Sequence, residues 1–194
     1  MTESSGWLRG VEGVLSGPDL TLTVERLAEW QLSDGMMPWY PGGHADPWNH
    51  VEALMALMLD GRKAEAEAGF AWLERLQHAD GSWHQYYLAG GGVEEAKFDA
   101  NCIAYVAAGL YHHWLLFEDR SFLDANWGML SGAVDFVRGL QTDRGEVFWA
   151  RKPDGTPFEF ALLTGSSSIT HSLRCAVAVA EVLGKERPEW VRSA

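Results

Sequence analysis

The stretch QLSDGMMPWYPGGHADPWNH at residues 31–50 contains the features that decide the fold. A glutamine closes a helical segment, a loop rich in Gly, Pro and Trp follows, and a second apolar segment starts at Asp46-Pro47. An aspartate followed by proline is a favourable helix start. Two later stretches repeat this plan, namely LQHADGSWHQYY at residues 76–87 and LQTDRGEVFWAR at residues 140–151.

Each of these three stretches contains the same three markers in the same order. A glutamine is followed by a glycine four residues later and then by a tryptophan; the sets are Gln31, Gly35 and Trp39, then Gln77, Gly81 and Trp83, then Gln141, Gly145 and Trp149. The plan recurs at intervals of about 45 to 65 residues. A unit that recurs at this spacing predicts a repeat architecture, here with two helices per repeat.

Two kinds of apolar pattern alternate along the chain. Residues 19–30, 62–77 and 123–138 have one apolar stripe opposite a charged face, whereas residues 47–59, 98–117 and 166–183 are apolar around most of the helix. A helix that is apolar all round is buried on all sides, and a one-sided helix lies at the surface. The pattern therefore predicts outer and inner helices in alternation, with the start of a further outer helix at Arg187. We expect Asp19 or Thr21 to cap the first helix and Ser166–Ser168 to cap the last inner one.

The lengths of the links predict where a site could form. Links from inner to outer helices have two to four residues, whereas the links at about residues 32–45, 78–97 and 142–165 are long. Long loops inside a compact helical domain are usually functional. All three precede an inner helix, so each inner helix directs its partly positive N-terminus toward one common region. We call the three long loops and the first turns of the inner helices the mouth.

Composition and charge narrow the classes of ligand. The formal net charge is -12, which disfavours nucleic acid and anionic membrane surfaces as partners. Cys102 and Cys175 lie inside separate apolar segments, so neither a disulfide framework nor a zinc cluster is expected. The chain begins without a basic segment followed by an apolar run, so we expect a cytoplasmic protein that acts on a neutral ligand. We predict one domain over residues 1–194, with no metal and no cofactor.

The predicted rings of inner and outer helices resemble the (α/α)6 toroid of six-hairpin glycosidases and terpene-cyclase-like proteins. Six stretches carry a narrower likeness: QHADGSW at residues 77–83, Asp99, EDRSFL at residues 118–123, Trp127, Asp135-Phe136 and LTGSSS at residues 163–168. Over about two thirds of the chain they are similar to glucoamylase-like (family 15) glycosidases. The chain also resembles the actinobacterial intracellular endomannosidases that act on methylmannose polysaccharide, although no single motif carries this likeness. The resemblance implies an intracellular inverting-type hydrolase of an α-linked oligo- or polysaccharide.

A competing resemblance comes from the same glutamines. Trp72, Gln77, Gly81 and Trp83 match the QW repeat of squalene-hopene-type cyclases, where the repeat is structural. The sequence lacks the Asp-x-Asp-Asp acid of those cyclases and the Asp-Asp-x-x-Asp magnesium motif of class I enzymes. A terpenoid cyclase or prenyltransferase-like protein is therefore the alternative, and a non-catalytic carbohydrate-binding protein is the third hypothesis.

A sugar site requires carboxylates for acid and base catalysis and aromatic rings that pack on pyranose faces. Asp46, at a helix start, suits a general base; Glu159, between Phe158 and Phe160, suits a general acid if its setting is apolar; Asp99 is the third candidate. Asp46 as a mere helix cap is an equally good interpretation. The predicted substrate-binding residues are Trp39, His44, Trp48, Asn49, His50, Trp83, Tyr86, Asn101, Trp149 and Arg151.

The family likeness also fails in two places. The general acid of the glucoamylase-like enzymes lies in a Trp-Glu-Glu motif, but here Trp149 is followed by Ala150-Arg151, so that role cannot be carried over by position. The predicted helices make up about half of an (α/α)6 barrel, incomplete on its C-terminal side. Half a ring exposes apolar flanks, so we expect self-association or a missing second half.

Overall fold

The computed structural model describes residue 7 and residues 9–194, and this part of the chain is mostly helical. Its helices are α1 (Gly17–Trp30), α2 (Pro47–Leu59), α3 (Lys63–Leu76), α4 (Ala100–Ala104), α5 (Val106–Phe117), α6 (Arg120–Ala125), α7 (Trp127–Arg138), α8 (Leu163–Leu183) and α9 (Pro188–Ser193). Its strands are β1 (Tyr86–Tyr87), β2 (Val93–Glu95), β3 (Phe98–Asp99) and β4 (Ala150–Arg151), and a 3-10 turn, η1, spans Ala89–Gly91. The predicted all-α class is confirmed. The predicted lead-in at residues 1–18 lies partly outside the described residues.

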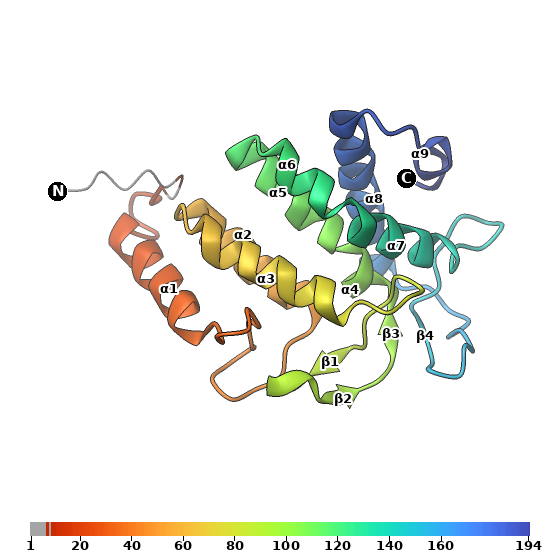
Figure 1. The fold of residues 1–194 in the computed structure, drawn as a ribbon, viewed down its shortest axis with the longest axis horizontal. Helices are drawn as coiled ribbons and strands as arrows, with labels where there is room; N and C mark the ends of the chain where they lie inside the picture. Colours follow the sequence, from red (N-terminus) through yellow and green to blue (C-terminus); the bar gives the residue numbers. More distant parts are fainter. Residues whose placement is uncertain (1–6, 8) are drawn as a thin grey trace.

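Inner and outer helices alternate as the apolar patterns predict. The inner helix α5 packs against both α2 and α8, and α3, α6 and α7 cover the inner helices from outside. Figure 1 shows the helices side by side, with the strands and long loops gathered at one end. The N-terminal ends of α2, α4 and α8 lie at that end, so the predicted mouth is present. Within the described residues, no helix has both the length and the hydropathy needed to cross a membrane.

The structure corrects several predicted boundaries. The predicted inner helix at 98–117 is two helices that meet at Tyr105, and the outer helix before Gly139 is likewise interrupted at Asn126. Ser16 caps α1 through a capping box with Asp19, so neither Asp19 nor Thr21 is the N-cap. Helix α8 begins at Leu163, which places Ser166–Ser168 inside its first turns and not at its cap.

The three glutamines have one structural role, which explains why they recur. The side-chain amide of Gln77 donates to the carbonyl oxygen of Gly81 at 3.0 Å and to that of Met129 in α7 at 2.9 Å. Gln31 donates in the same way to Gly35 and to Glu65 in α3, and Gln141 donates to Gly145 and to Ser193 in α9. Each glutamine therefore closes its own turn and joins it to the next outer helix in the chain.

Candidate functional site

Asp46 lies at the N-terminus of α2 with no exposed surface. One carboxylate oxygen accepts the backbone N–H groups of Trp48 and Asn49 at 2.8 and 3.0 Å. The other accepts the indole N–H of Trp39 at 2.5 Å and the side-chain amide of Asn49 at 2.8 Å. All four donors are N–H groups, as expected around a carboxylate that caps a helix. Asp46 therefore holds both the helix start and the Trp39 side chain in place.

Asp99 has the matching position at the start of α4. Its carboxylate accepts the N–H groups of Asn101 and Cys102 at 3.0 and 3.3 Å, and the nearby Trp149 side chain also lowers its pKa. Its backbone pairs with Ala150, which ties the second loop of the mouth to the third. Burial raises the pKa of Asp99 above its usual value, and these hydrogen bonds and the charge of Lys97 oppose that rise only in part. Asp99 is therefore easier to protonate than an aspartate exposed to solvent.

The two aspartates share the same neighbours. Burial raises the pKa of the Cys102 thiol, and the negative charges of Asp99 and Asp46 raise it further. Burial raises the pKa of the Tyr86 phenol as well, and the charges of Asp46 and Asp99 add to this rise. The amide of Gln85 points at the Cys102 sulfur at 3.7 Å. The structure thus brings together Asp46, Asp99 and Tyr86, and adds Gln85 and Cys102, for which the sequence offers no distinguishing signal.

Several buried polar atoms around this cluster have no hydrogen-bond partner among the described residues. They are Trp48 Nε1, Gln85 Oε1, Asn101 Oδ1 and His44 Nε2. Buried polar groups are rarely left unpaired, and an unpaired set often marks a place that a ligand or water occupies. This set contains both donors and acceptors, as the binding of hydroxyl groups requires.

Aromatic side chains lie beside the cluster on the first two loops. His44 stacks on Tyr86 with ring centroids 4.2 Å apart, and Trp39 meets Tyr86 edge-on at 5.9 Å. Trp39 is 46% exposed, so one of its faces is open to a ligand. His44 Nδ1 also lies 2.5 Å from a carboxylate oxygen of Glu94 in β2, and this pair links the first loop to the second.

Three predicted binding residues are occupied by other contacts. Trp83 is 1% exposed and donates its indole N–H to Leu73, so it has no face left for a sugar. His50 is fully buried, and both its ring nitrogens bond to backbone groups. Trp149 packs against Phe160 on one side and carries Lys97 Nζ 4.1 Å from its ring centroid. Trp83 and His50 support the fold, and Trp149 supports Asp99.

His50 gives a testable pH dependence of stability. Its Nδ1 accepts the N–H of Met37 at 3.0 Å, and its Nε2 donates to the carbonyl of Gly69 at 3.0 Å, so the folded state requires neutral imidazole. Burial lowers the pKa of His50 from 6.5 to about 4. Between these two values the unfolded chain binds a proton that the folded chain does not. Acidification from pH 6.5 to 4 should therefore remove up to about 3 kcal/mol of stability.

The test compares the free energy of unfolding of the wild type with that of His50→Asn, measured by urea denaturation at several pH values. Asparagine can still accept from Met37 but does not titrate. The variant should be less stable at pH 7, and the gap should narrow as the pH falls to 4. An unchanged gap over this range would show that His50 does not titrate on unfolding.

Glu159 does not have the apolar setting predicted for it. Residues 157–160 run beside β4, where the backbone N–H of Phe158 bonds to Ala150 and that of Trp149 bonds to Phe160. In such an extended segment side chains alternate in direction. Phe158 and Phe160 turn toward Trp149, which leaves Glu159 between them exposed to solvent. Glu159 therefore lacks the apolar surroundings that the predicted general-acid role requires.

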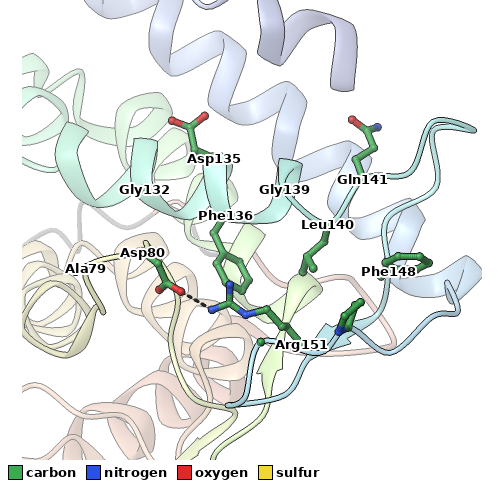
Figure 2. Close-up of a pocket in the computed structure, with 12 residues that line it drawn as sticks. Ala79, Asp80, Gly132, Asp135, Phe136, Gly139, Leu140, Gln141, Phe148 and Arg151 are labelled. Atoms are coloured by element: carbon green, nitrogen blue, oxygen red, sulfur yellow. Dashed lines mark hydrogen bonds and ion pairs between the residues drawn. The ribbon is translucent and has the colours of Figure 1, made fainter.

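Arg151 lies beside a separate cavity of about 650 Å³ between α7 and the third loop. Figure 2 shows its side chain directed at Asp80, with which it forms an ion pair, next to the ring of Phe136. The guanidinium lies 4.5 Å from the Phe136 ring centroid and 5.1 Å from that of Phe98. These contacts hold the third loop against the second. Neither Asp46 nor Asp99 lines this cavity.

Solved structures with the same arrangement of helices establish the fold. An unsaturated glucuronyl hydrolase from Bacillus sp. GL1 superposes with a TM-score of 0.63 at 15% identity, over 91% of this chain and 52% of that chain. A cellobiose 2-epimerase from Spirochaeta thermophila superposes with a TM-score of 0.57 at 19% identity, over 82% and 45% of the two chains. This chain has the fold of about half an (α/α)6 toroid. The predicted six-hairpin architecture is confirmed.

This chain is similar in sequence to a mannosidase and to an uncharacterized glycosyl hydrolase. It is 45% identical over 181 residues to the MMP endo-(1,4)-3-O-methyl-alpha-D-mannosidase of Mycolicibacterium hassiacum, which covers 93% of this chain and 50% of that protein. It is 23% identical over 143 residues to an uncharacterized glycosyl hydrolase of Methanocaldococcus jannaschii, which covers 71% and 22% of the two proteins. The toroid therefore spans about half the length of the mannosidase and less of the second relative. No protein-family model matches the sequence.

Proposed function

We propose that this chain contributes to the active site of a glycoside hydrolase that cleaves an α-(1,4)-linked polysaccharide containing 3-O-methylmannose. The observation that carries the proposal is the pair of buried aspartates at the starts of two neighbouring inner helices. The unpaired donors and acceptors beside them suit a hydroxylated ligand. The 45% identity to an endomannosidase supports the choice of substrate.

The two aspartates have different roles in this proposal. Hydrolysis of a glycosidic bond uses one protonated carboxyl group, which donates a proton to the leaving oxygen, and a second carboxylate. Asp99 is the general acid, because burial raises its pKa and so favours its protonated form. Asp46 is the second carboxylate. Since its oxygens accept four N–H groups in the structure, it could act on a water molecule only after one donor moves away.

The indole of Trp39 is the donor best placed to move. It is the exposed member of the four, and its ring is the open platform beside the cluster. A pyranose that stacks on Trp39 would shift the ring and remove one of the two donors to that oxygen of Asp46, which then accepts only the Asn49 amide. Trp39, Trp48, Asn49, Asn101, His44 and Tyr86 remain the proposed substrate-binding residues of this site, and Arg151 is proposed to support its third loop.

The proposal is tested by incubating the protein with α-(1,4)-linked 3-O-methylmannose oligosaccharides and measuring new reducing ends. Unmethylated α-mannosides, α-glucosides and an isoprenoid diphosphate serve as comparison substrates. We expect cleavage of the methylated mannosides in preference to the others. Binding without cleavage would favour a carbohydrate-binding protein, and turnover of the diphosphate alone would favour a cyclase-like enzyme.

We also propose that a second half-ring completes the inner face of this toroid in the cytoplasm. Leu163 at the start of α8, the last inner helix, is 88% exposed, and Val191 on α9 is 60% exposed. Large exposed apolar side chains at the flanks of an arc are the places where further helices would pack. Sedimentation of the protein at several concentrations distinguishes self-association from a monomer.

A further inference from the structure

One face of the inner helices is directed away from the outer helices. On α2, Trp48, Glu52, Met55 and Leu59 recur at helical spacing, and none of them is fully buried, whereas His50 and Leu57 on the opposite side are. We call this side of α2, together with the matching sides of α4, α5 and α8, the lumen face. Its first turns below the mouth are polar or aromatic, and its far end is apolar.

Glu52 and Tyr105 form a pair on the lumen face. The phenol of Tyr105 donates a short hydrogen bond to one carboxylate oxygen of Glu52. The ring of Tyr105 also packs on Trp48, with centroids 5.3 Å apart. Glu52 lies six residues after Asp46, and Tyr105 lies six residues after Asp99. At 1.5 Å per residue both therefore lie about 9 Å below the capping aspartates.

The proton between the two groups belongs to Tyr105. Burial raises the pKa of its phenol, and the hydrogen bond to Glu52 raises it further. The other titratable groups that face the pair are His112, whose pKa is lowered by burial, and Cys175 on α8. No hydrogen bond to the second carboxylate oxygen of Glu52 is found within residues 9–194. That oxygen is free to accept hydrogen bonds from a ligand.

Polar atoms without a partner extend from the mouth to this level. Trp48 Nε1, Asn101 Oδ1, Ser168 Oγ and His112 Nε2 are buried without a hydrogen bond to any described residue. Trp48 connects the two levels, because its backbone N–H bonds to Asp46 while its ring packs on Tyr105. Trp48 therefore contacts both the capping carboxylate of Asp46 and the Glu52–Tyr105 pair's aromatic ring.

We propose that Glu52, Tyr105 and Trp48 form a second saccharide-binding subsite about 9 Å deeper in the toroid than Asp46 and Asp99. The proposal rests on the proposed function. In this subsite the free oxygen of Glu52 accepts hydrogen bonds from sugar hydroxyls, and the rings of Trp48 and Tyr105 pack on the apolar face of the same sugar. The subsite binds one unit of the chain that runs inward from the cleavage point.

A purely structural role explains the pair less well. An ion pair or hydrogen bond at an exposed carboxylate adds little to stability, and Glu52 is exposed. Helices α2 and α5 are already joined by close apolar packing, in which the fully buried Val51 lies against Gly109. The fold therefore does not need the charge of Glu52 at this position.

The test is Glu52→Gln, which keeps an acceptor for Tyr105 but replaces the free oxygen with an amide. Affinity is measured by tryptophan fluorescence for a short and a long α-(1,4)-linked 3-O-methylmannose oligosaccharide, beside kcat and KM. The matched control is Glu29→Gln on the outer helix α1, where Glu29 is exposed and pairs with Arg26. Loss of a hydrogen bond to a charged group predicts roughly tenfold weaker binding. The loss should affect the long oligosaccharide and spare the short one.

The outcomes separate the two proposals. If Glu52→Gln binds the long oligosaccharide as tightly as the wild type does, the subsite is refuted while the proposed function stands. If the wild type binds neither oligosaccharide, the proposed function is refuted and the subsite with it. Should Glu52→Gln fail to fold, Tyr105→Leu decides the question: it removes the ring that packs on the sugar, and unchanged binding of the long oligosaccharide would refute the subsite.

Discussion

Replacing Gly81 with alanine should destabilise the protein more than any other single change considered. Gly81 has a φ of +87°, and a Cβ atom on it would lie 2.0 Å from the carbonyl oxygen of Gly132 in α7. The atoms that this Cβ would meet all belong to the backbone of Gly132, which cannot move aside as a flexible side chain can. We expect a loss above about 4 kcal/mol, which lowers the melting temperature by roughly 10 °C or more for a chain of this size.

Gly145 provides the matched control for this experiment. It occupies the same place in the third repeat with a φ of +99°, but no described atom lies within 4 Å of an added Cβ. Gly145→Ala should therefore show only the strain of the left-handed backbone, about 1 to 2 kcal/mol. Thermal unfolding followed by circular dichroism compares the two. Equal losses in both variants would show that the contact between Gly81 and α7 does not matter for stability.

Asp99→Asn should reduce hydrolysis by about 100- to 10,000-fold, the usual range for loss of a general acid. The melting temperature should change little, because asparagine caps a helix about as well as aspartate. Burial also disfavours the charge of Asp99, as its raised pKa shows, so a neutral amide of the same shape is tolerated there. A stable variant with full activity would exclude Asp99 as the acid.

Two further measurements support the assignment of Asp99. The activity of the wild type should fall as the pH rises through the pKa of Asp99, because the acid must be protonated. That descending limb should be absent from the residual activity of Asp99→Asn. Asp154→Asn is the control on the exposed third loop, where either side chain can accept the N–H of Thr156. It should hydrolyse the substrate at the rate of the wild type.

Much of the fold could be predicted because the residues that define each repeat lie close together in the sequence. The recurring glutamines and glycines predicted the turns, and apolar periodicity predicted which helices are inner. Asp46-Pro47 predicted a capped helix correctly, since a cap depends on residues next to it in the chain. The strands escaped prediction because each has only two or three residues, and β3 pairs with β4 across about 50 residues of sequence.

The site was harder to predict because its members depend on side-chain direction. Trp39 and Trp83 hold matching places in their repeats, yet one is exposed and the other buried. Whether Glu159 meets solvent depends on the alternation of a strand-like segment whose partner lies elsewhere in the chain. Glu52 and Tyr105 meet although 53 residues separate them. Neighbouring residues in the sequence carry no information about such contacts.

The side-chain hydrogen bonds of Gln31, Gln77 and Gln141 couple the unfolding of successive repeats. Each of these side chains joins two successive repeats, so local unfolding of one repeat also breaks a hydrogen bond to the next. Loss of order should then spread along the arc in a nearest-neighbour sequence. Amide hydrogen exchange should show graded protection, lowest in α9, whose link through Gln141 to Ser193 is the longest of the set at 3.4 Å.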